Sequence, residues 1–237
     1  MKATTKSALL ARVTRRQRKK YVEIQTAPKK GRIVQHRGRH FVAHPGVFWA
    51  FYDNRLLDII PRIISPSDRV LDIGTGTGIM AILAANAGAG YVLAADINRA
   101  AVLCARENVR KHHLQSKIHV RQSDVYSALG PDEKFDVVLA NLPFRNKKAA
   151  DIVEASMWDT HLHAHRAFFQ GLEKHLKPDG KAYLCQANYG AVKEVNKMAL
   201  AAGFSVRRIA AKKFPANHEL AGCEFYAFEI RRKKGSR

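Results

Sequence analysis

Cysteine is scarce in this sequence of 237 residues, and the three cysteines, Cys104, Cys185 and Cys223, are far apart. No two of them have the close spacing of a zinc site, and an odd number does not fit a framework of paired disulfides. We therefore expect free thiols that are buried or half-buried, and no metal centre built on cysteine.

Long apolar runs are also missing. A membrane helix needs about 20 consecutive apolar residues, and no uncharged apolar run approaches that length. The short apolar patch at residues 8–11 is followed by basic residues and has no small-residue cleavage site, unlike a secretory signal. These absences predict a cytoplasmic protein without a membrane partner. The 46% hydrophobic content is typical of a packed globular core.

Acidic residues are nearly absent from the first 40 residues, and basic residues are enriched at both ends of the chain. Residues 1–40 contain 13 lysines and arginines and one acid, whereas residues 206–237 contain nine and three. Residues 41–205 contain 19 and 16, so most of the net charge of +21 lies at the ends. A nearly neutral body with basic ends favours a polyanionic partner, most often RNA. The alternative is a solvated tail without a specific partner.

The first 40 residues differ in character from the rest. Residues 1–20 have few large apolar side chains, which predicts a basic extension that is mobile when unbound. Two β-prone runs, 21–24 and 32–34, flank a Pro/Gly turn and predict a hairpin. We expect this hairpin to be a small lobe or a substrate lip. The sequence thus divides into a basic extension at 1–40 and one domain at 41–237.

From residue 41 onward, helix and strand signals alternate. Helical spacing or composition is found at residues 47–64, 78–87, 98–112, 161–176 and 191–202. Strand signals are found at residues 69–73, 91–95, 117–121, 135–140, 181–186, 204–209 and 224–230. Such alternation predicts an α/β fold, doubly wound, with a mostly parallel sheet covered on both faces.

A glycine-rich turn follows the first of these strands, in the run VLDIGTGTG at residues 70–78. Glycine is needed where the backbone approaches a ligand closely or takes a positive φ. In open α/β sheets the ligand binds beyond the carboxyl ends of the strands. The turn alone also fits the looser form of a dinucleotide site, so the neighbouring residues must decide.

Three acids accompany the turn. Asp72 lies inside the strand before it, where a carboxylate can receive the amino group of a methionine-like ligand. Asp96 ends the second strand and can accept hydrogen bonds from both ribose hydroxyls, a feature shared with NAD sites. Asp124 follows the third strand, where a side chain can bind an adenine amino group. The three together favour a methionine-containing nucleoside.

With these pieces in order (VLDIGTGTG, AADIN, QSD and ANLPF, with Asn108 in a helix), residues 41–209 resemble a class I methyltransferase dependent on S-adenosylmethionine (SAM), in particular the small-domain group that methylates amino or amide nitrogens. The resemblance implies SAM as cofactor and a Rossmann-like sheet of seven strands in the order 3-2-1-4-5-7-6, with strand 7 antiparallel. The implied cofactor-binding residues are Asp72, Gly74, Thr75, Gly76, Gly78, Asp96, Ile97, Asp124 and Asn141.

The fourth strand leads into Asn141-Leu142-Pro143-Phe144, which resembles the (N/D)PP(Y/F) motif of enzymes that methylate planar nitrogens. The lone pair of such a nitrogen is delocalised and must be localised before it attacks. The Asn141 side-chain oxygen can accept one N–H and the carbonyl of Leu142 the other, and these bonds strengthen as positive charge develops. Phe144 can stack on the substrate. Leu142 replaces the usual first proline, so the turn is expected to be less rigid.

Further residues are candidates for substrate contacts. Residues 141–144, here called the reaction loop, are followed by the basic residues Arg145, Lys147 and Lys148. These either hold a phosphate or are solvated. Phe48 belongs to an aromatic group with Trp49, Phe51 and Tyr52, and Asp53 follows this group. In the family that the chain resembles, this region packs over the cofactor or the substrate. The alternative is that these aromatic residues serve ordinary helix packing. His161 and His165 would share a helix face, but no acid or cysteine completes a metal site. We expect no metal there.

These features predict a SAM-dependent N-methyltransferase that acts on guanine N2 or adenine N6 of rRNA or tRNA. RNA is the expected partner, and an association with the ribosome or a translation factor is compatible with the charge. The first alternative is a protein methyltransferase acting on a glutamine amide, and a small-molecule methyltransferase comes next. An inactive RNA-binding protein is the non-enzyme alternative. An NAD-dependent oxidoreductase is disfavoured because no proton-donor constellation accompanies the glycine turn.

Overall fold

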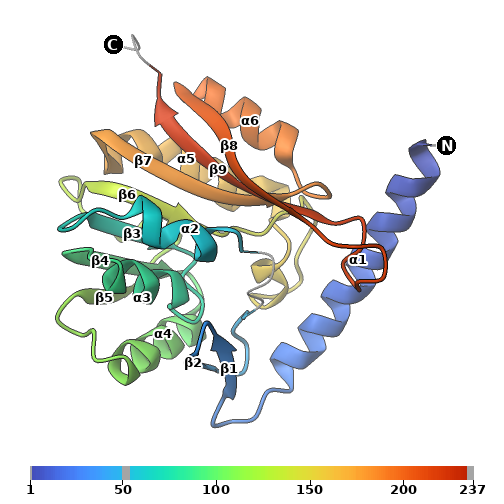
Figure 1. Ribbon diagram of the computed structural model, residues 1–237, viewed down its shortest axis with the longest axis horizontal. Coiled ribbons are helices and arrows are strands. Elements are labelled where there is room, and N and C mark those ends of the chain that lie inside the picture. The colour runs from blue at the N-terminus through green and yellow to red at the C-terminus, as the bar shows by residue number, and fades with distance from the viewer. Residues whose placement is uncertain (1, 50–53, 234–237) are drawn as a thin grey trace.

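The computed structural model describes residues 2–49 and 54–233. Seven strands form one sheet in the order β5-β4-β3-β6-β7-β9-β8, with helices on both of its faces (Figure 1). The strands are β3 (Arg69–Ile73), β4 (Tyr91–Asp96), β5 (Ile118–Gln122), β6 (Phe135–Ala140), β7 (Leu176–Ala187), β8 (Phe204–Lys213) and β9 (Glu224–Arg232). All run parallel except β9, which pairs antiparallel with both of its neighbours. The expected order 3-2-1-4-5-7-6 is confirmed when β3 is counted as the first strand.

Two hydrophobic cores lie on opposite faces of the sheet, because successive side chains of a strand point to opposite faces. In β3, Val70 belongs to one core and its neighbour Leu71 to the other. The first core includes side chains of α2 (Leu56–Ile63) and α3 (Ile79–Asn86), and the second includes those of α5 (His163–His175) and α6 (Val192–Ala201). The apolar runs of the central strands are therefore buried on both faces.

The N-terminal segment differs from the expectation. Residues 2–25 form one long helix, α1 (Lys2–Gln25), rather than a mobile tail followed by a strand at 21–24. Val13 and Ile24 are buried against the body and Tyr21 is half-buried, so tertiary packing at helical spacing outweighs the β propensity of these residues. α1 lies outside the layered core, and the connection between β8 and β9 reaches it (Figure 1).

A hairpin does form, but later in the sequence than expected. It consists of β1 (Arg32–His36) and β2 (Arg39–Ala43), joined at Arg37 and Gly38. Both turn residues have positive φ, 48° and 75°, the conformation that two-residue hairpin turns require. The signal that sequence analysis overlooked is therefore the Arg-Gly pair rather than the earlier Pro/Gly turn.

Several other boundaries shift. Of the helix expected at 47–64, only α2 is present, and residues 47–49 are not helical. Residues 50–53 lie outside the described residues, so the predicted roles of Phe51, Tyr52 and Asp53 are not tested. α5 begins at His163, because His161 and Leu162 have φ of 54° and 56°. The expected stop at 177–180 is part of β7, which starts at Leu176. α4 (Arg99–Lys111) and the remaining strands follow the prediction within a few residues.

The three cysteines are buried free thiols, as expected. Burial raises the pKa of Cys104 to about 12, so this thiol stays protonated at neutral pH. Within the described residues, none of the helices has the length and apolar character needed to cross a membrane.

Candidate active site

The glycine-rich turn between β3 and α3 holds three glycines in the left-handed region, with φ of 70° at Gly74, 57° at Gly76 and 82° at Gly78. Two of them are also close to other segments. A Cβ atom on Gly76 would lie 3.4 Å from the carbonyl oxygen of Phe48, and one on Gly78 would lie 3.2 Å from the Cβ of Ala105. The left-handed conformation therefore favours glycine at all three positions, and the tight approach of Ala105 adds to this preference at Gly78.

A cavity of about 320 Å³ opens next to this turn, at the carboxyl edge of the parallel strands. Its size is within the usual range for a small-molecule site. It is lined by most of the predicted cofactor residues, namely Gly74, Thr75, Gly76, Asp96, Ile97, Asp124 and Asn141. One predicted substrate residue, Phe48, lines it as well. Gly78 and Asp72 lie behind the lining rather than in it.

Asp72 is fully buried at the base of the turn. Its Oδ2 accepts hydrogen bonds from the Thr75 hydroxyl at 2.6 Å and from the Ala81 N–H at 3.2 Å. Its Oδ1 has no partner among the residues that the structure describes. Burial, first of all, raises the pKa of Asp72 to about 7. A buried carboxylate without a counter-ion is costly, so this atom fits a ligand that carries an ammonium group.

The two other acids end neighbouring strands. Asp96 accepts the Gly76 N–H with Oδ2 and the Asn98 N–H with Oδ1, each at 2.9 Å, and burial raises its pKa. Asp124 lies 2.9 Å from the Nε2 of His163, a surface pair at the rim of the cavity. Both carboxylates thus line the cavity while backbone groups or a histidine hold them in position.

The reaction loop begins at Asn141, directly after β6. The Oδ1 atom of Asn141 is buried and has no hydrogen-bond partner within the described parts of the chain. Leaving a buried acceptor unpaired costs about 1–3 kcal/mol, so this atom is suited to receive a donor from a substrate. Asn141, Leu142 and Pro143 line both the large cavity and a smaller one of about 60 Å³.

Phe144 has a different environment from the other three residues of the loop. Its ring is 7% exposed and lies 6.1 Å from the rings of Tyr189 and Phe225, and its carbonyl accepts the Ala191 N–H at 2.8 Å. It lines the smaller cavity only. Phe144 therefore anchors the loop in the core. Its stacking on a substrate stays a prediction, and such a substrate would lie in the smaller cavity.

Arg145 and Lys147 line neither cavity. The Nη1 of Arg145 donates to the Thr14 hydroxyl at 2.8 Å and to the Gln17 Oε1 at 3.0 Å, both on α1. The Lys147 ammonium lies 3.3 Å from the centre of the Trp158 ring. In this structure both cations tie the segment after the reaction loop to neighbouring elements.

Sequence analysis missed the contribution of α1. Val13, Arg16, Gln17 and Lys20 line the smaller cavity, which also reaches Tyr189 and Phe225. Their spacing of three and four residues puts them on one face of a helix. That spacing is visible in the sequence, but the many basic residues around it favoured the interpretation as a basic extension that is mobile when unbound.

The histidine run does not form a helix face, because α5 begins only at His163. His165 is fully buried, with Nδ1 2.7 Å from Asp159 Oδ2 and Nε2 2.7 Å from Gln186 Nε2. Asp159 also accepts the backbone N–H groups of Ala164 and His165 at the start of α5. Among the residues described, no group of three or more His, Cys, Asp or Glu side chains is arranged to hold a metal ion.

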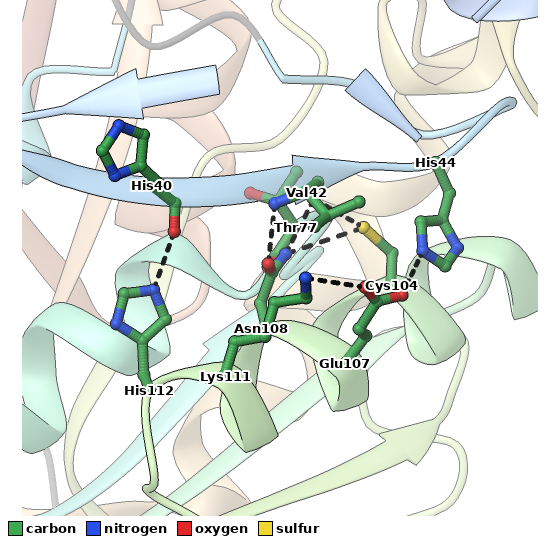
Figure 2. Close-up of polar contacts among 9 residues, drawn as sticks. All are labelled: His40, Val42, His44, Thr77, Cys104, Glu107, Asn108, Lys111 and His112. Atoms are coloured by element: carbon green, nitrogen blue, oxygen red, sulfur yellow. Dashed lines mark hydrogen bonds and ion pairs between the residues drawn. The ribbon is translucent and has the colours of Figure 1, made fainter. Parts of the chain in front are cut away.

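Asn108 connects the hairpin to the cofactor turn (Figure 2). Its Oδ1 accepts the Val42 N–H, and its Nδ2 donates to the carbonyls of Val42 and Thr77, all at 2.8 Å. Other polar contacts join the hairpin segment to α4, namely His44 with Glu107, His112 with the His40 carbonyl and Cys104 with the Val42 carbonyl. Asn108 thus ties the turn at Thr77 to Val42 of β2.

A sheet of this order, with a glycine-rich turn and acids at its carboxyl edge, is the class I fold of SAM-dependent methyltransferases. The methyltransferase small domain family matches residues 38–213, and the chain belongs to this family. SAM is the methyl donor of the family, and the Oδ1 of Asp72, which has no partner in the described part of the chain, fits the ammonium of its methionine part.

Curated relatives include a release factor glutamine methyltransferase of Cereibacter sphaeroides, 34% identical over 134 residues that cover 52% of this chain and 48% of the relative. A ribosomal protein L11 methyltransferase of Lactobacillus gasseri is 32% identical over 152 residues, 64% of this chain and 41% of the relative. The chain spans less than half the length of these relatives.

Solved structures show the same fold. The T. thermophilus 16S rRNA N2 G1207 methyltransferase, in complex with AdoMet and guanosine, has a TM-score of 0.60 at 19% identity, covering 85% of this chain and 50% of that one. The ribosomal protein L11 methylase of Lactobacillus delbrueckii has a TM-score of 0.57 at 20% identity, with 78% and 80% covered.

Proposed function

We propose that this protein transfers a methyl group from SAM to an exocyclic nitrogen of a base in rRNA or tRNA, either guanine N2 or adenine N6. The observation that carries the proposal is the buried Oδ1 of Asn141, which has no partner among the residues that the structure describes and lies where the two cavities meet. An acceptor in this position matches the N–H groups of an amine that approaches from the smaller cavity.

The larger cavity is the proposed cofactor site. Asp72 receives the ammonium group, Asp96 the ribose hydroxyls and Asp124 the adenine amino group. The backbone of the turn at Gly74, Thr75 and Gly76, with Ile97 at the rim, surrounds the rest, and Gly78 supports the turn from behind the lining. When bound, SAM supplies an electrophilic methyl group on a sulfonium.

The reaction loop activates the nucleophile in this proposal. Asn141 Oδ1 accepts one N–H of the amine and the carbonyl of Leu142 accepts the other, which localises the nitrogen lone pair. These hydrogen bonds strengthen as positive charge builds on nitrogen, so they stabilise the transition state more than the ground state. Pro143 restrains the loop, and the core contacts of Phe144 hold its end.

The distribution of basic side chains supports RNA as the substrate. Arg15, Arg18 and Lys19 are exposed along the outer side of α1, and Arg207, Arg208, Lys212 and Lys213 are exposed on β8. The connection from β8 to β9 reaches α1 (Figure 1), and Leu220 and Cys223 of this connection line the smaller cavity together with α1. Lysines and arginines in such an arrangement bind phosphates without reading sequence.

The first test is transfer of tritium from methyl-labelled SAM into unmodified ribosomes, tRNA and protein. Asn141→Ala is compared with Asn196→Ala, because the Oδ1 of Asn196 on α6 is also buried and unpartnered in the described residues but lines neither cavity. We expect label in RNA with the wild type and Asn196→Ala, and none with Asn141→Ala. Label in RNA that survives Asn141→Ala contradicts the proposal.

The second candidate is methylation of a glutamine amide in a protein of the translation apparatus. It is favoured by the similarity to the release factor glutamine methyltransferase, and the same loop chemistry serves an amide. Label in protein that depends on Asn141 supports this candidate instead. Both candidates act on cytoplasmic components, and in both we propose residues 41–237 as the catalytic domain with 1–40 as its basic extension.

A further inference from the structure

Three polar side chains form a buried chain of hydrogen bonds beside the reaction loop. His165 and Gln186 are fully buried and line neither cavity, and Asp159, at 4% exposure, lines the larger one. His165 Nδ1 lies 2.7 Å from Asp159 Oδ2, and His165 Nε2 lies 2.7 Å from Gln186 Nε2. Burying polar side chains is costly, and the methyl transfer proposed above uses none of these three, so the chain is a candidate for a further role.

The direction of the two hydrogen bonds follows from the groups that form them. A carboxylate only accepts, so the Nδ1–H of His165 donates to Asp159. The Nε2 atom of the neutral ring then accepts an N–H of the Gln186 amide. The amide oxygen of Gln186 has no partner among the residues that the structure describes. His165 therefore links Gln186 on β7 to Asp159, which precedes α5.

The Asp159 end of this chain holds the backbone directly after the reaction loop. The Asp159 N–H donates to the Arg145 carbonyl at 2.8 Å, and Trp158 forms a parallel bridge with Arg145. The Asp159 side chain is fixed at the same time by His165 and by the backbone N–H of Ala164. Because both the backbone and the side chain of Asp159 are held, the position of the Arg145 carbonyl depends on the chain.

The Gln186 end reaches the last residue of the loop itself. The Phe144 carbonyl accepts the Ala191 N–H at 2.8 Å. A Cβ atom on Gly190 would lie 2.5 Å from Gln186 Oε1 and 2.7 Å from the Phe144 carbonyl oxygen. Glycine at this position thus lets the amide of Gln186 pack closely against the end of the loop. Two consecutive carbonyls, those of Phe144 and Arg145, are held from opposite ends of one chain.

We propose that His165 is a positioning residue for methyl transfer, because it holds the end of the reaction loop through Asp159 on one side and Gln186 on the other. The chain keeps the Asn141 side-chain oxygen and the Leu142 carbonyl in the geometry that receives the amine. A displacement of about 1 Å can lower a rate by about a hundredfold, so a small shift of the loop is sufficient. This inference rests on the proposed function but not on which nitrogen is methylated, because a base amine and a glutamine amide use the same loop.

Two variants delete the same hydrogen bond from opposite sides. His165→Asn keeps an N–H near the position of Nδ1 and so keeps the bond to Asp159, but it is too short to reach Gln186. Gln186→Met replaces the amide by an apolar side chain of similar size. Its cost in stability is small, because it also removes an oxygen that has no partner in the described part of the chain. The control is His175→Asn, since His175 is buried at the other end of α5 and contacts the Glu133 carbonyl.

The first measurement is the single-turnover rate of transfer from methyl-labelled SAM, at saturating concentration, into unmodified ribosomes, tRNA and protein. We expect His165→Asn and Gln186→Met each to lower this rate about tenfold, with unchanged SAM affinity by calorimetry. Because both delete one bond, the double variant should be no slower than either single variant. His175→Asn should change the rate by less than about twofold, and its effect should multiply with that of Gln186→Met.

The second measurement is amide hydrogen exchange by NMR, which needs no methyl transfer. The amides of Ala191 and Asp159 donate to the two held carbonyls. Their protection should fall in both variants, by about tenfold at Ala191, relative to the Val92 amide, which donates to the Lys117 carbonyl at 2.9 Å. His175→Asn should leave these ratios unchanged. An equal loss of protection at all three amides indicates lower global stability alone and overturns the inference.

The remaining outcomes are distinct. Losses that multiply in the double variant, or a loss of SAM affinity equal to the loss of rate, overturn the positioning role. Unchanged protection at Ala191 does so as well, and so does an unchanged rate in variants that have lost protection. If His165→Asn fails to fold, Gln186→Met decides by both measurements. If the wild type labels none of the three fractions, the proposed function fails, and hydrogen exchange alone decides whether the chain holds the loop.

Discussion

The two halves of the active site are assembled in different ways. The cofactor half takes its glycine turn and its three acids from one stretch, residues 69–124, and residues 48, 49 and 54 together with the segment 141–164 complete the cavity. The acceptor half combines α1, the reaction loop and the β8–β9 connection, which are far apart in the sequence. The glycine turn and the acids of the cofactor site therefore follow one another in the sequence, whereas the acceptor site forms through tertiary contacts between distant segments.

The largest effect is expected in the cofactor half, at Asp72. Its folded-state pKa of about 7 is above the usual 3.8, so the folded protein holds a proton that the unfolded chain releases. The free energy of unfolding of the SAM-free protein should therefore fall as pH rises from about 4 to about 7. Asp72→Asn should remove this dependence and stabilise the protein above pH 7 by up to about 4 kcal/mol.

Urea unfolding at several pH values measures this difference, and calorimetry measures the effect on the cofactor. SAM affinity of the wild type should decrease as pH falls through 7, because protonation removes the carboxylate. Asp72→Asn should bind SAM weakly at every pH. A variant that is no more stable than the wild type above pH 7, or that binds SAM normally, contradicts the assigned role.

The next effect concerns Asn108, which joins the cofactor turn to the hairpin. Asn108→Ala removes the side-chain partner of the Val42 N–H and of the Thr77 carbonyl in a buried place, while the Val42 carbonyl keeps its contact with the Cys104 thiol. We expect a loss of about 3 kcal/mol in the free energy of unfolding, measured by urea titration. Asn86→Ala is the control, since Asn86 makes one bond, to the Ile82 carbonyl of its own helix. Equal losses in the two variants would show that the connection is dispensable.

The same contrast explains what could be predicted from the sequence. The strand order is implied by the family resemblance, whereas the cavity residues Gly74 to Gly76 and Asp96 follow from an apolar strand, a glycine turn and a terminal acid, each of which is a local signal. The roles of Asp72 and Asn141 follow from residue type. Each has one side-chain oxygen without a partner among the described residues, which agrees with these roles but does not test them. The end of the helix at residues 2–25 was not predicted, because Tyr21 and Ile24 belong to a β-prone run and are helical where they pack against the body.

A smaller effect is expected at Gln17, in the acceptor half. Gln17→Ala removes contacts with Arg145, Trp158 and the Met157 carbonyl. We expect a loss of about 1–2 kcal/mol in stability and a lower kcat for methyl transfer, with unchanged SAM affinity. Gln25→Ala, on the same helix but exposed, is the control. A loss of SAM affinity in Gln17→Ala would mean that the two halves are not separable.

The smallest effect is expected at Lys147, at the edge of the acceptor half. Its ammonium lies over the Trp158 ring, and a cation–π contact at a partly exposed site contributes about 0.5–1 kcal/mol. Lys147→Met should therefore lower stability by no more than that and shift the fluorescence of Trp158. Lys148→Met removes the same charge from an exposed neighbour and should do neither. If both variants instead weaken RNA binding equally, the two lysines act as phosphate contacts, and the boundary of the acceptor half extends beyond α1 to the segment after the reaction loop.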